Sequence, residues 1–311
     1  MKTLKEQVDE IVKSNKSKQT KSVSLVKLGL SPYEVSLLLG SIKVQKGCKF
    51  SANTLTFGIE CETYNVVRDT LIREVEQRNI SIQSEGYNHR DNNHYYKIVS
   101  DASIQGTNGQ EIVSPILKGK KGLDSLKMVC DSLNAIGAKV NKSTGLHVHF
   151  DASKISDSHF VQIFKNYQKL ERVIDSFMPQ SRRANNNGYC KSVQGLNYDI
   201  CTTKSDIIRV NNTRYRKINA ESYLSHKTVE FRQHSGTTEY DKIANWINFL
   251  RKLIQYSFEN EIPECSSIEE MKYQYSINYS DKFNLIGYRL KKIEEGYYMA
   301  VLTLSERRGK K

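Results

Sequence analysis

Three short segments of the chain, residues 57–62, 146–151 and 229–234, alternate between apolar and polar residues. Successive side chains of an extended chain point to opposite faces, so each segment is expected to form a strand with one apolar and one polar face. The polar positions do not carry the Lys, Thr, Ser and Gln that usually meet water on a sheet. They form three pairs: Glu60 with Glu62, His147 with His149, and Glu230 with Arg232.

These pairs have the chemistry of a ligand site. Carboxylate oxygens and imidazole nitrogens bind divalent cations, and the planar guanidinium fork suits phosphate. The three pairs together predict a cation- and phosphate-binding face on a sheet. The same alternation places His234 on the face of Glu230, in contact with substrate or at the strand end. It places Asp151 on the face of the two histidines, where it could fix an imidazole tautomer.

Helical periodicity marks three further segments, residues 123–136, 160–177 and 243–254, in which apolar residues recur every three to four positions. Each apolar stripe is expected to face the core. Trp246 continues the third stripe and is expected to pack rather than to stack on a base. Strands alternating with such helices predict an α+β fold.

The two ends of the chain differ from this core, which we place at residues 51–260. Residues 1–50 are expected to form a small basic helical extension, because apolar residues from Leu4 to Ile11 have helical spacing and residues 31–34 are typical of a helix start. This extension either mimics a helix-turn-helix or docks on the main domain. Residues 261–311 are rich in Tyr and Lys and are expected to form a helical segment.

Composition sets the outer limits. The 311 residues, 38% hydrophobic and 26% charged, can bury a sizeable core. No long apolar run or secretory signal occurs, so we expect a cytoplasmic protein with no membrane contact. The net charge of +13 gathers at the two ends, which fits solvated tails or weak nucleic-acid contact. The scattered cysteines argue against a zinc knuckle or a disulfide framework, and Cys61 is expected to be buried.

Several motifs in order resemble the amidoligases of the glutamine synthetase-like carboxylate-amine ligase superfamily, many of which come from bacteria and phages. Residues 58–62 are similar to the family's G-x-E-x-E strand, and residues 97–103 and 109–115 to its D-x-S and G-x-E-[LIV]-V-S-P segments. Residues 145–149 are similar to its G-x-H-V-H strand. Its closing R-Y, N and T-[VI]-E-F-R elements correspond to Arg214, Tyr215, Asn219 and residues 228–232. The resemblance covers residues 54–256.

The resemblance implies a curled antiparallel sheet around an ATP site, with helices packed on the outer face of the sheet. Carried over residue by residue, it implies one Mg²⁺ bound by Glu60, His147 and Glu230, and a second Mg²⁺ bound by Glu62 and Glu111. Glu111 is the one ligand that alternation alone does not single out. A histidine is less usual for Mg²⁺, so Mn²⁺ is an alternative metal.

The remaining implied contacts concern the nucleotide and the substrates. His149, Arg214, Asn219 and Arg232 are expected to bind ATP, with Arg232 also stabilising the transferred phosphoryl group. The polar loop at residues 179–205 is expected to be a lid or disordered. Arg183 in this loop is expected to contact an anion or to be merely solvated. Asp101 is expected to bind the amine, to orient a metal ligand or to cap a turn.

The leading functional hypothesis is an ATP-dependent carboxylate-amine ligase of a bacterial or phage-infected cell. Such an enzyme activates a carboxylate as an acyl phosphate, which an amine from an amino acid, peptide or protein then attacks; cations stabilise the transferred group. Three alternatives stay open: a phosphotransferase on the same fold, a hydrolase in which His147, His149 and a carboxylate bind a metal, and a nucleic-acid binder that uses the basic ends.

Overall fold

The structure is a computed structural model that describes residues 4–28, 35, 39, 55–86, 94–258 and 261–262. The described residues before position 50 and those from 55 to 261 belong to two separate compact units. No helix in these described ranges has both the length and the apolar character needed to cross a membrane.

The first unit contains two short helices, α1 (Leu4–Lys13) and α2 (Lys18–Lys27). Their buried contact is made by Val8 and Leu25, together with Val35. Ser17 begins α2, and its side chain accepts a hydrogen bond from the amide of Thr20. The helical spacing near Leu4 therefore corresponds to α1. Residues 31–34 and 263–311, for which helical structure was also predicted, lie outside the described residues.

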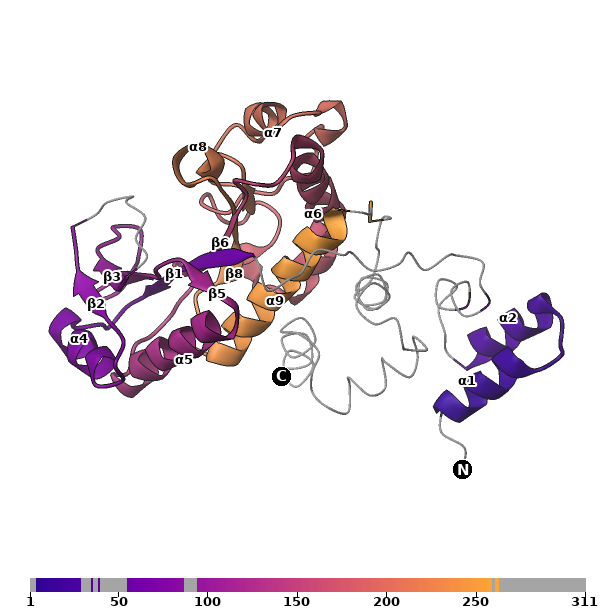
Figure 1. The fold of residues 1–311 in the computed structure, drawn as a ribbon, viewed down its shortest axis with the longest axis horizontal. Coiled ribbons are helices and arrows are strands. Elements are labelled where there is room, and N and C mark those ends of the chain that lie inside the picture. The colour runs from indigo at the N-terminus through magenta and orange to yellow at the C-terminus, as the bar shows by residue number, and fades with distance from the viewer. Residues whose placement is uncertain are drawn as a thin grey trace. The chain divides into compact units, whose positions relative to one another are not determined.

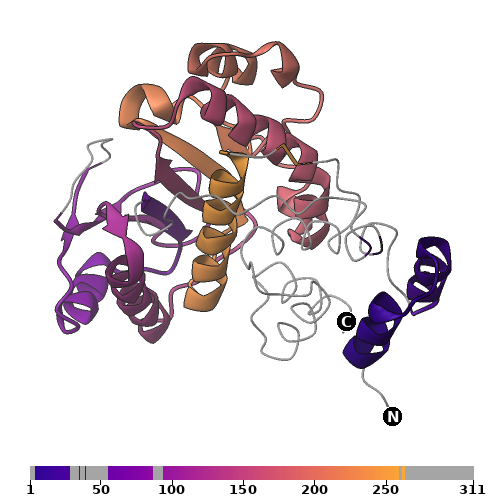
Figure 2. The same cartoon turned by 45° about the vertical axis from the view of Figure 1, so that its right-hand side comes forward.

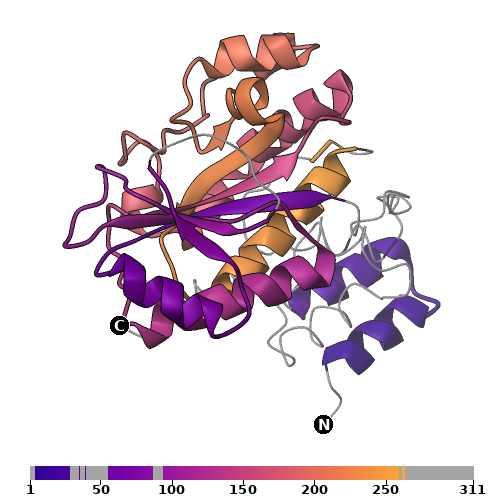
Figure 3. The ribbon, with the colours of Figure 1, turned by 60° about the vertical axis from the view of Figure 1, so that its left-hand side comes forward.

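The second unit is built on one eight-stranded sheet with the strand order β2-β3-β4-β1-β6-β8-β7, in which β5 also pairs with β1. The β2–β3 pair is parallel and the other pairs are antiparallel. Figure 3 shows the twist of this sheet. The strands are β1 (Thr56–Thr63), β2 (Ile82–Ser84), β3 (Tyr96–Val99), β4 (Gln110–Val113), β5 (Leu117–Lys118), β6 (Gly145–Asp151), β7 (Ile218–Asn219) and β8 (Thr228–Ser235).

Helices cover one face of this sheet (Figures 1 and 2). The ring of Tyr167 lies against Phe231 of β8, and the hydroxyls of Tyr96 on β3 and Ser125 lie 3.1 Å apart. The helices of this unit are α4 (Arg68–Glu76), α5 (Gly119–Ala135), α6 (Asp157–Phe177), α7 (Lys204–Asn211), α8 (Ser222–His226) and α9 (Tyr240–Ser257), with short 3₁₀ turns η2 (Gln180–Arg182) and η3 (Tyr198–Ile200).

The predicted periodicities correspond to these elements. The three apolar stripes lie on α5, α6 and α9, and the stripe residues of α6 from Phe160 to Phe177 are buried. The three alternating segments form β1, β6 and β8, which are neighbours in the sheet. On β1, Phe57, Ile59 and Cys61 are buried. The prediction of an α+β fold with a mostly antiparallel sheet and packed helices is therefore confirmed.

A β-bulge interrupts the pairing of β6 with β8. Leu146 pairs with His234 while Val148 pairs with Phe231, so β8 contains one residue more than β6 over this stretch. An extra residue shifts the alternation, so the side chains that follow it in the strand point to the opposite face of the sheet from the one expected. His234 therefore lies against the ring of Trp246 on α9, with the ring centres 5.4 Å apart, and is only 1% exposed. The prediction that His234 shares the face of Glu230 is wrong for this reason.

A buried ionic network ties β7 and β8 to α6. The ammonium group of Lys217, which is 0% exposed, lies 2.7 Å from the Glu171 carboxylate and 2.5 Å from that of Asp175. Gln233 of β8 donates to the same Asp175 carboxylate and accepts from the hydroxyl of Tyr167. Buried charges need such partners, because an unpaired charge in the interior is costly.

This network predicts a large effect of removing its cation. Lys217→Met keeps most of the side-chain volume but leaves Glu171 and Asp175 without a counter-charge. We expect it to lower the free energy of unfolding by about 3–5 kcal/mol. The surface pair of Lys169 with Glu261 supplies the control, since Lys169→Met should cost less than about 1 kcal/mol. Urea denaturation measures both, and equal losses would show that the network does not stabilise the fold.

The buried His234 predicts a pH dependence of stability. Burial, together with the positive charges of Arg182 and Lys242, lowers the pKa of its imidazole to about 4. The hydrogen bond to the Ser235 carbonyl opposes this shift but does not cancel it. The unfolded chain has an ordinary histidine pKa near 6.5, so on acidification it binds a proton that the folded chain excludes. Stability is therefore lost as the pH falls from about 6.5 towards 4.

We expect His234→Leu to abolish this loss. Between pH 7 and pH 5 the wild type should lose about 2 kcal/mol of unfolding free energy more than the variant loses. Urea denaturation followed by the fluorescence of Trp246, the only tryptophan, measures the difference. Parallel pH profiles for the two proteins would contradict this account of His234.

Candidate active site

The face of the sheet opposite the helices forms the floor of a cleft of about 900 Å³. That volume is typical of small-molecule sites. Residues of β1, β4, β6 and β8 line the floor, and the segments around Ser100, Pro115, Tyr189 and Arg214 line the sides. All three polar pairs predicted from the alternation belong to this cleft.

Strand register explains how the pairs meet. Glu60 of β1 pairs with His147 of β6, and His149 of β6 pairs with Glu230 of β8. On the other side of β1, Glu62 pairs with Glu111 of β4. Side chains of directly paired residues point to the same face. Four neighbouring strands therefore bring carboxylates and imidazoles from distant parts of the sequence together.

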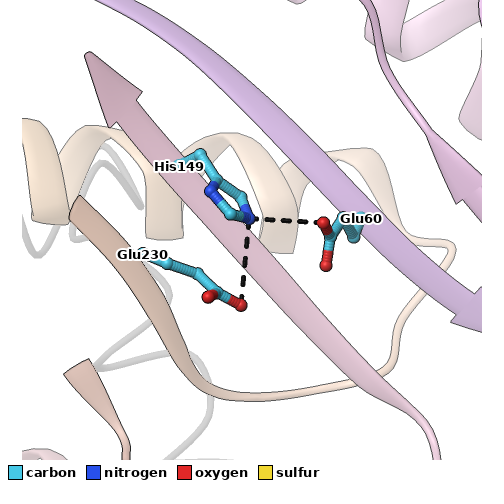
Figure 4. A group of neighbouring side chains, drawn as sticks. All are labelled: Glu60, His149 and Glu230. Atoms are coloured by element: carbon cyan, nitrogen blue, oxygen red, sulfur yellow. Dashed lines mark ion pairs between the residues drawn. The ribbon is translucent and has the colours of Figure 1, made fainter. Parts of the chain in front are cut away.

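The first group of potential cation ligands contains Glu60, His149 and Glu230 (Figure 4). The Nε2 atom of His149 is buried and has no hydrogen-bond partner. It lies 3.4 Å from Glu60 Oε1 and 3.8 Å from Glu230 Oε1, while Nδ1 lies 3.0 Å from the hydroxyl of Thr228. An imidazole held at one nitrogen, with the other facing two carboxylates, is the usual arrangement of a metal ligand. These residues therefore fit a divalent cation.

Two further groups follow, of which the second shares Glu60 with the first and the third shares Glu111 with the second. One contains Glu60, Glu111 and His147, and the other contains Glu62, Asp101 and Glu111. Within each group the ligand atoms lie within 4.8 Å of one another. The resemblance implied His147 beside Glu60 and Glu230; in the structure both His147 and His149 lie beside these two carboxylates. The structure also adds Asp101 to the expected pair of Glu62 and Glu111.

Asp101 and His147 each have a second contact. Asp101 accepts a hydrogen bond of 2.7 Å from the amide of Ser103, which is the turn cap that the sequence offered as an alternative. His147 has Nδ1 2.8 Å from Glu60 Oε2 and 3.6 Å from Glu230 Oε1, and Nε2 3.6 Å from Glu62 Oε1. His147 therefore lies between the groups and contacts all three carboxylates.

The crowding of carboxylates shifts their pKa values in opposite directions. Burial and the negative charges of Glu60, Glu62 and Asp101 raise the pKa of Glu111 well above its usual range. Burial also opposes the ionisation of Glu60, but His149 and His147 outweigh it and lower the pKa of that carboxyl. Glu111 thus lies among uncompensated negative charges, which a bound cation would offset.

Arg232 forms an ion pair with Glu230. Its Nη1 group donates to Glu230 Oε1 and lies 3.4 Å from Nδ1 of His147. Burial opposes the charge of Glu230, yet Arg232 and His149 lower the pKa of that carboxyl. Asn219 donates a 2.6 Å hydrogen bond to the other oxygen of Glu230. In this structure Asn219 and Arg232 both orient Glu230.

The loop that follows α6 is ordered by its own side chains. Asn185 and Asn187 accept hydrogen bonds from the amides of Ser192 and Tyr189, and Asn186 donates to the Gln180 carbonyl. This local bonding explains why the loop has a defined conformation, where the sequence predicted a lid or disorder.

The two arginines of this loop point to different places. Arg183 does not line the cleft; its guanidinium donates to the carbonyls of Met178 and Ser176 at the end of α6, at 2.8 and 3.4 Å. Arg182 lines the cleft and is 2% exposed. Sequence reasoning favoured Arg183 for an anion contact. Nothing in the residue pattern distinguishes two adjacent arginines in a loop without periodicity.

The other predicted residues lie at the rim. Arg214 is exposed and lies over the ring of Tyr215, with its guanidinium carbon 5.1 Å from the ring centre. Asp151 lines the cleft and accepts a hydrogen bond from the amide of Ser153. No described contact joins Asp151 to an imidazole. Lys97 of β3 also lines the cleft, and its ammonium group lies 3.4 Å from the Glu85 carboxylate. The sequence did not single out Lys97 as a site residue.

Glu60, like Glu111, belongs to two of the ligand groups, so its removal should weaken cation binding at both of its groups. We expect Glu60→Gln to weaken Mn²⁺ binding by about 10- to 100-fold or more. Glu76→Gln, on the exposed surface of α4, is the control and should bind Mn²⁺ like the wild type. Calorimetric titration with Mn²⁺ measures both. Equal affinity in Glu60→Gln and the wild type would show that cations do not bind at this face.

Sequence comparison agrees with this geometry. The model of a protein family described as "putative amidoligase enzyme" matches residues 53–254, well over half of the chain, and these residues include every strand of the cleft floor. No curated protein matches the chain. The chain belongs to this amidoligase family, whose description is that of an enzyme of the ligase type.

Proposed function

We propose that the protein is an ATP-dependent carboxylate-amine ligase that uses divalent cations and forms an amide through an acyl phosphate. The observation that carries this proposal is the set of three overlapping ligand groups on one face of the sheet, inside a cleft of about 900 Å³. The family match supports a ligase. We further propose that the sheet is a glutamine synthetase-like catalytic fold, in which helices cover the face away from the nucleotide.

In this proposal Glu60, Glu111, Glu230 and the two histidines would hold Mg²⁺ or Mn²⁺, which would supply positive charge for the triphosphate and the transferred phosphoryl group. The protein's own groups orient these ligands. Thr228 holds His149 by its Nδ1 atom, and Asn219 with Arg232 fixes the carboxylate of Glu230.

The walls of the cleft supply different chemistry for the rest of the nucleotide and the substrates. Ile116 is 52% exposed and lines the cleft together with Pro115, so this wall offers apolar contact to a base. Tyr189 and Tyr215 pack edge to face at 5.3 Å and lie beside Arg214 on another part of the rim. We assign the apolar wall to the base and the aromatic and basic rim to a substrate.

A metal-dependent hydrolase is the second candidate, because the unshared Nε2 of His149 between two carboxylates would equally suit a metal that activates water. Such an enzyme needs no nucleotide. Dependence of turnover on ATP separates the two candidates.

The deciding experiment incubates the purified chain with ATP, Mg²⁺ or Mn²⁺ and pooled amino acids and peptides, and follows ADP and new product masses. We expect ADP, phosphate and an amide whose formation needs both a carboxylate and an amine. ADP with a phosphorylated product and no amide would instead indicate a phosphotransferase.

Two variants test whether the reaction uses this cleft. We expect Arg232→Ala to lower the rate by about 10³-fold or more, because a cation near the transferred group is lost and Glu230 is left unpaired. Glu62→Gln should abolish turnover without unfolding the protein. Arg172→Gln, exposed on α6, is the control for a change of charge. Full turnover by both cleft variants would show that the reaction does not take place in this cleft.

A further inference from the structure

We infer that Arg182 is the oxyanion receptor of the cleft, and that it binds the carboxylate of the acid substrate or the phosphoryl group placed on that carboxylate. The inference deepens the proposed function and rests on it for the identity of the anion. It concerns a residue that stands next to the arginine favoured by sequence reasoning and that lies in the cleft itself.

The first observation is a buried charge without a counter-charge. Arg182 is 2% exposed, and its Nη2 atom donates 2.5 Å to the carbonyl of Thr144. Its Nε atom has no acceptor, and the guanidinium forms no ion pair with any carboxylate of the described residues. Burying a guanidinium in this way is unfavourable unless an anion completes the site.

The other buried cations of the cleft differ from Arg182. Arg232 is paired with Glu230, and Lys97 with Glu85. Below the sheet, Lys217 is paired with two carboxylates. Among the described residues, Arg182 is thus the buried cation of the cleft whose charge is available to a ligand.

The groups packed around Arg182 do not supply an anion. Burial lowers the pKa of His234 to about 4, so its imidazole is neutral at pH 7, and the positive charge of Arg182 contributes to that shift. Burial also raises the pKa of the Cys190 thiol, although Arg182 and other cations oppose the change. Neither this imidazole nor this thiol supplies a negative charge to the guanidinium.

The position of Arg182 relative to the cation ligands is set by Gly145. A methyl group added at Gly145 would lie 3.0 Å from Nη2 of Arg182 and 3.0 Å from Nε2 of His147. The amide of Gly145 donates 2.6 Å to the carboxylate of Glu62. The guanidinium, an imidazole and a carboxylate of the candidate cation groups thus converge on one glycine, whose missing side chain lets the guanidinium and the imidazole approach the strand this closely.

The loop presents Arg182 in a fixed orientation. The amide of Arg182 donates to the Pro179 carbonyl at 2.8 Å, and Arg183 anchors the loop to the end of α6. Ala184 donates its amide to Asp175, a member of the buried network of Lys217. A receptor that is already ordered loses little conformational entropy when its ligand binds. The planar guanidinium can donate two parallel hydrogen bonds to a carboxylate or phosphate.

The test measures the binding of inorganic phosphate to the full chain by calorimetry, with and without Mn²⁺–ADP, and then the affinities for Mn²⁺–ATP and Mn²⁺–ADP. We expect Arg182→Gln to weaken phosphate binding by about 10- to 100-fold, the effect of losing a charged hydrogen bond. The affinity for Mn²⁺–ADP should change less than about threefold. Arg172→Gln, with the same change of charge on the exposed surface of α6, should bind phosphate like the wild type.

Two arms identify the source of the anion. Competition by acetate against phosphate in the wild type indicates that the receptor takes a carboxylate. A loss in Arg182→Gln of affinity for ATP but not for ADP indicates that it takes the terminal phosphoryl group. Either result supports the inference. Should Arg182→Gln fail to show the unfolding temperature of the wild type, Arg182→Lys replaces it; a lysine keeps the charge but not the fork and should bind phosphate more weakly.

The inference is overturned if Arg182→Gln binds phosphate like the wild type, if Arg172→Gln loses phosphate binding to the same extent, or if the wild type binds no phosphate. Failure of the proposed function gives a different result. In that case neither ATP nor ADP binds, while phosphate binding that depends on Arg182 persists and the inference stands.

Discussion

Repulsion between carboxylates on one face of a sheet is the constraint on which the site depends. Glu60, Glu62 and Glu111 meet because their strands pair in register, and burial together with the charges of Glu60 and Glu62 raises the pKa of Glu111. Such a cluster stays ionised only where positive charge compensates it. The two histidines lie between these carboxylates and Glu230, and the groups have the spacing of cation ligands. A bound metal ion would thus offset the negative charge that strand pairing gathers on this face.

The positive charges of this unit divide into those that hold the structure and those that a ligand can use. Lys217, next to β7, pairs with α6 on the helix-covered face of the sheet, and Arg232 orients Glu230 on the cleft face. Arg182 has no carboxylate partner among the described residues, although it is just as deeply buried. A stable fold would gain nothing from such a charge. Its presence is understandable if the cleft has to recognise an anion next to the candidate cation groups.

Alternation was enough to predict the three central strands and the pairs on their polar face, since a period of two assigns each side chain to a face. It failed at His234, because a β-bulge depends on the partner strand and leaves no mark in the local pattern. Glu111 required the motif resemblance, as its own strand is short and three of its four residues are buried. The choice between Arg182 and Arg183 depends on loop hydrogen bonds, which residue types alone do not specify.

The most direct test of the central claim is crystallographic. A crystal of the full chain grown with Mn²⁺ and a non-hydrolysable ATP analogue should show anomalous manganese density between Glu60, His149 and Glu230, with the triphosphate lying along the cleft. Manganese density only outside the cleft, or carboxylates turned away from one another in the presence of Mn²⁺, would contradict the account.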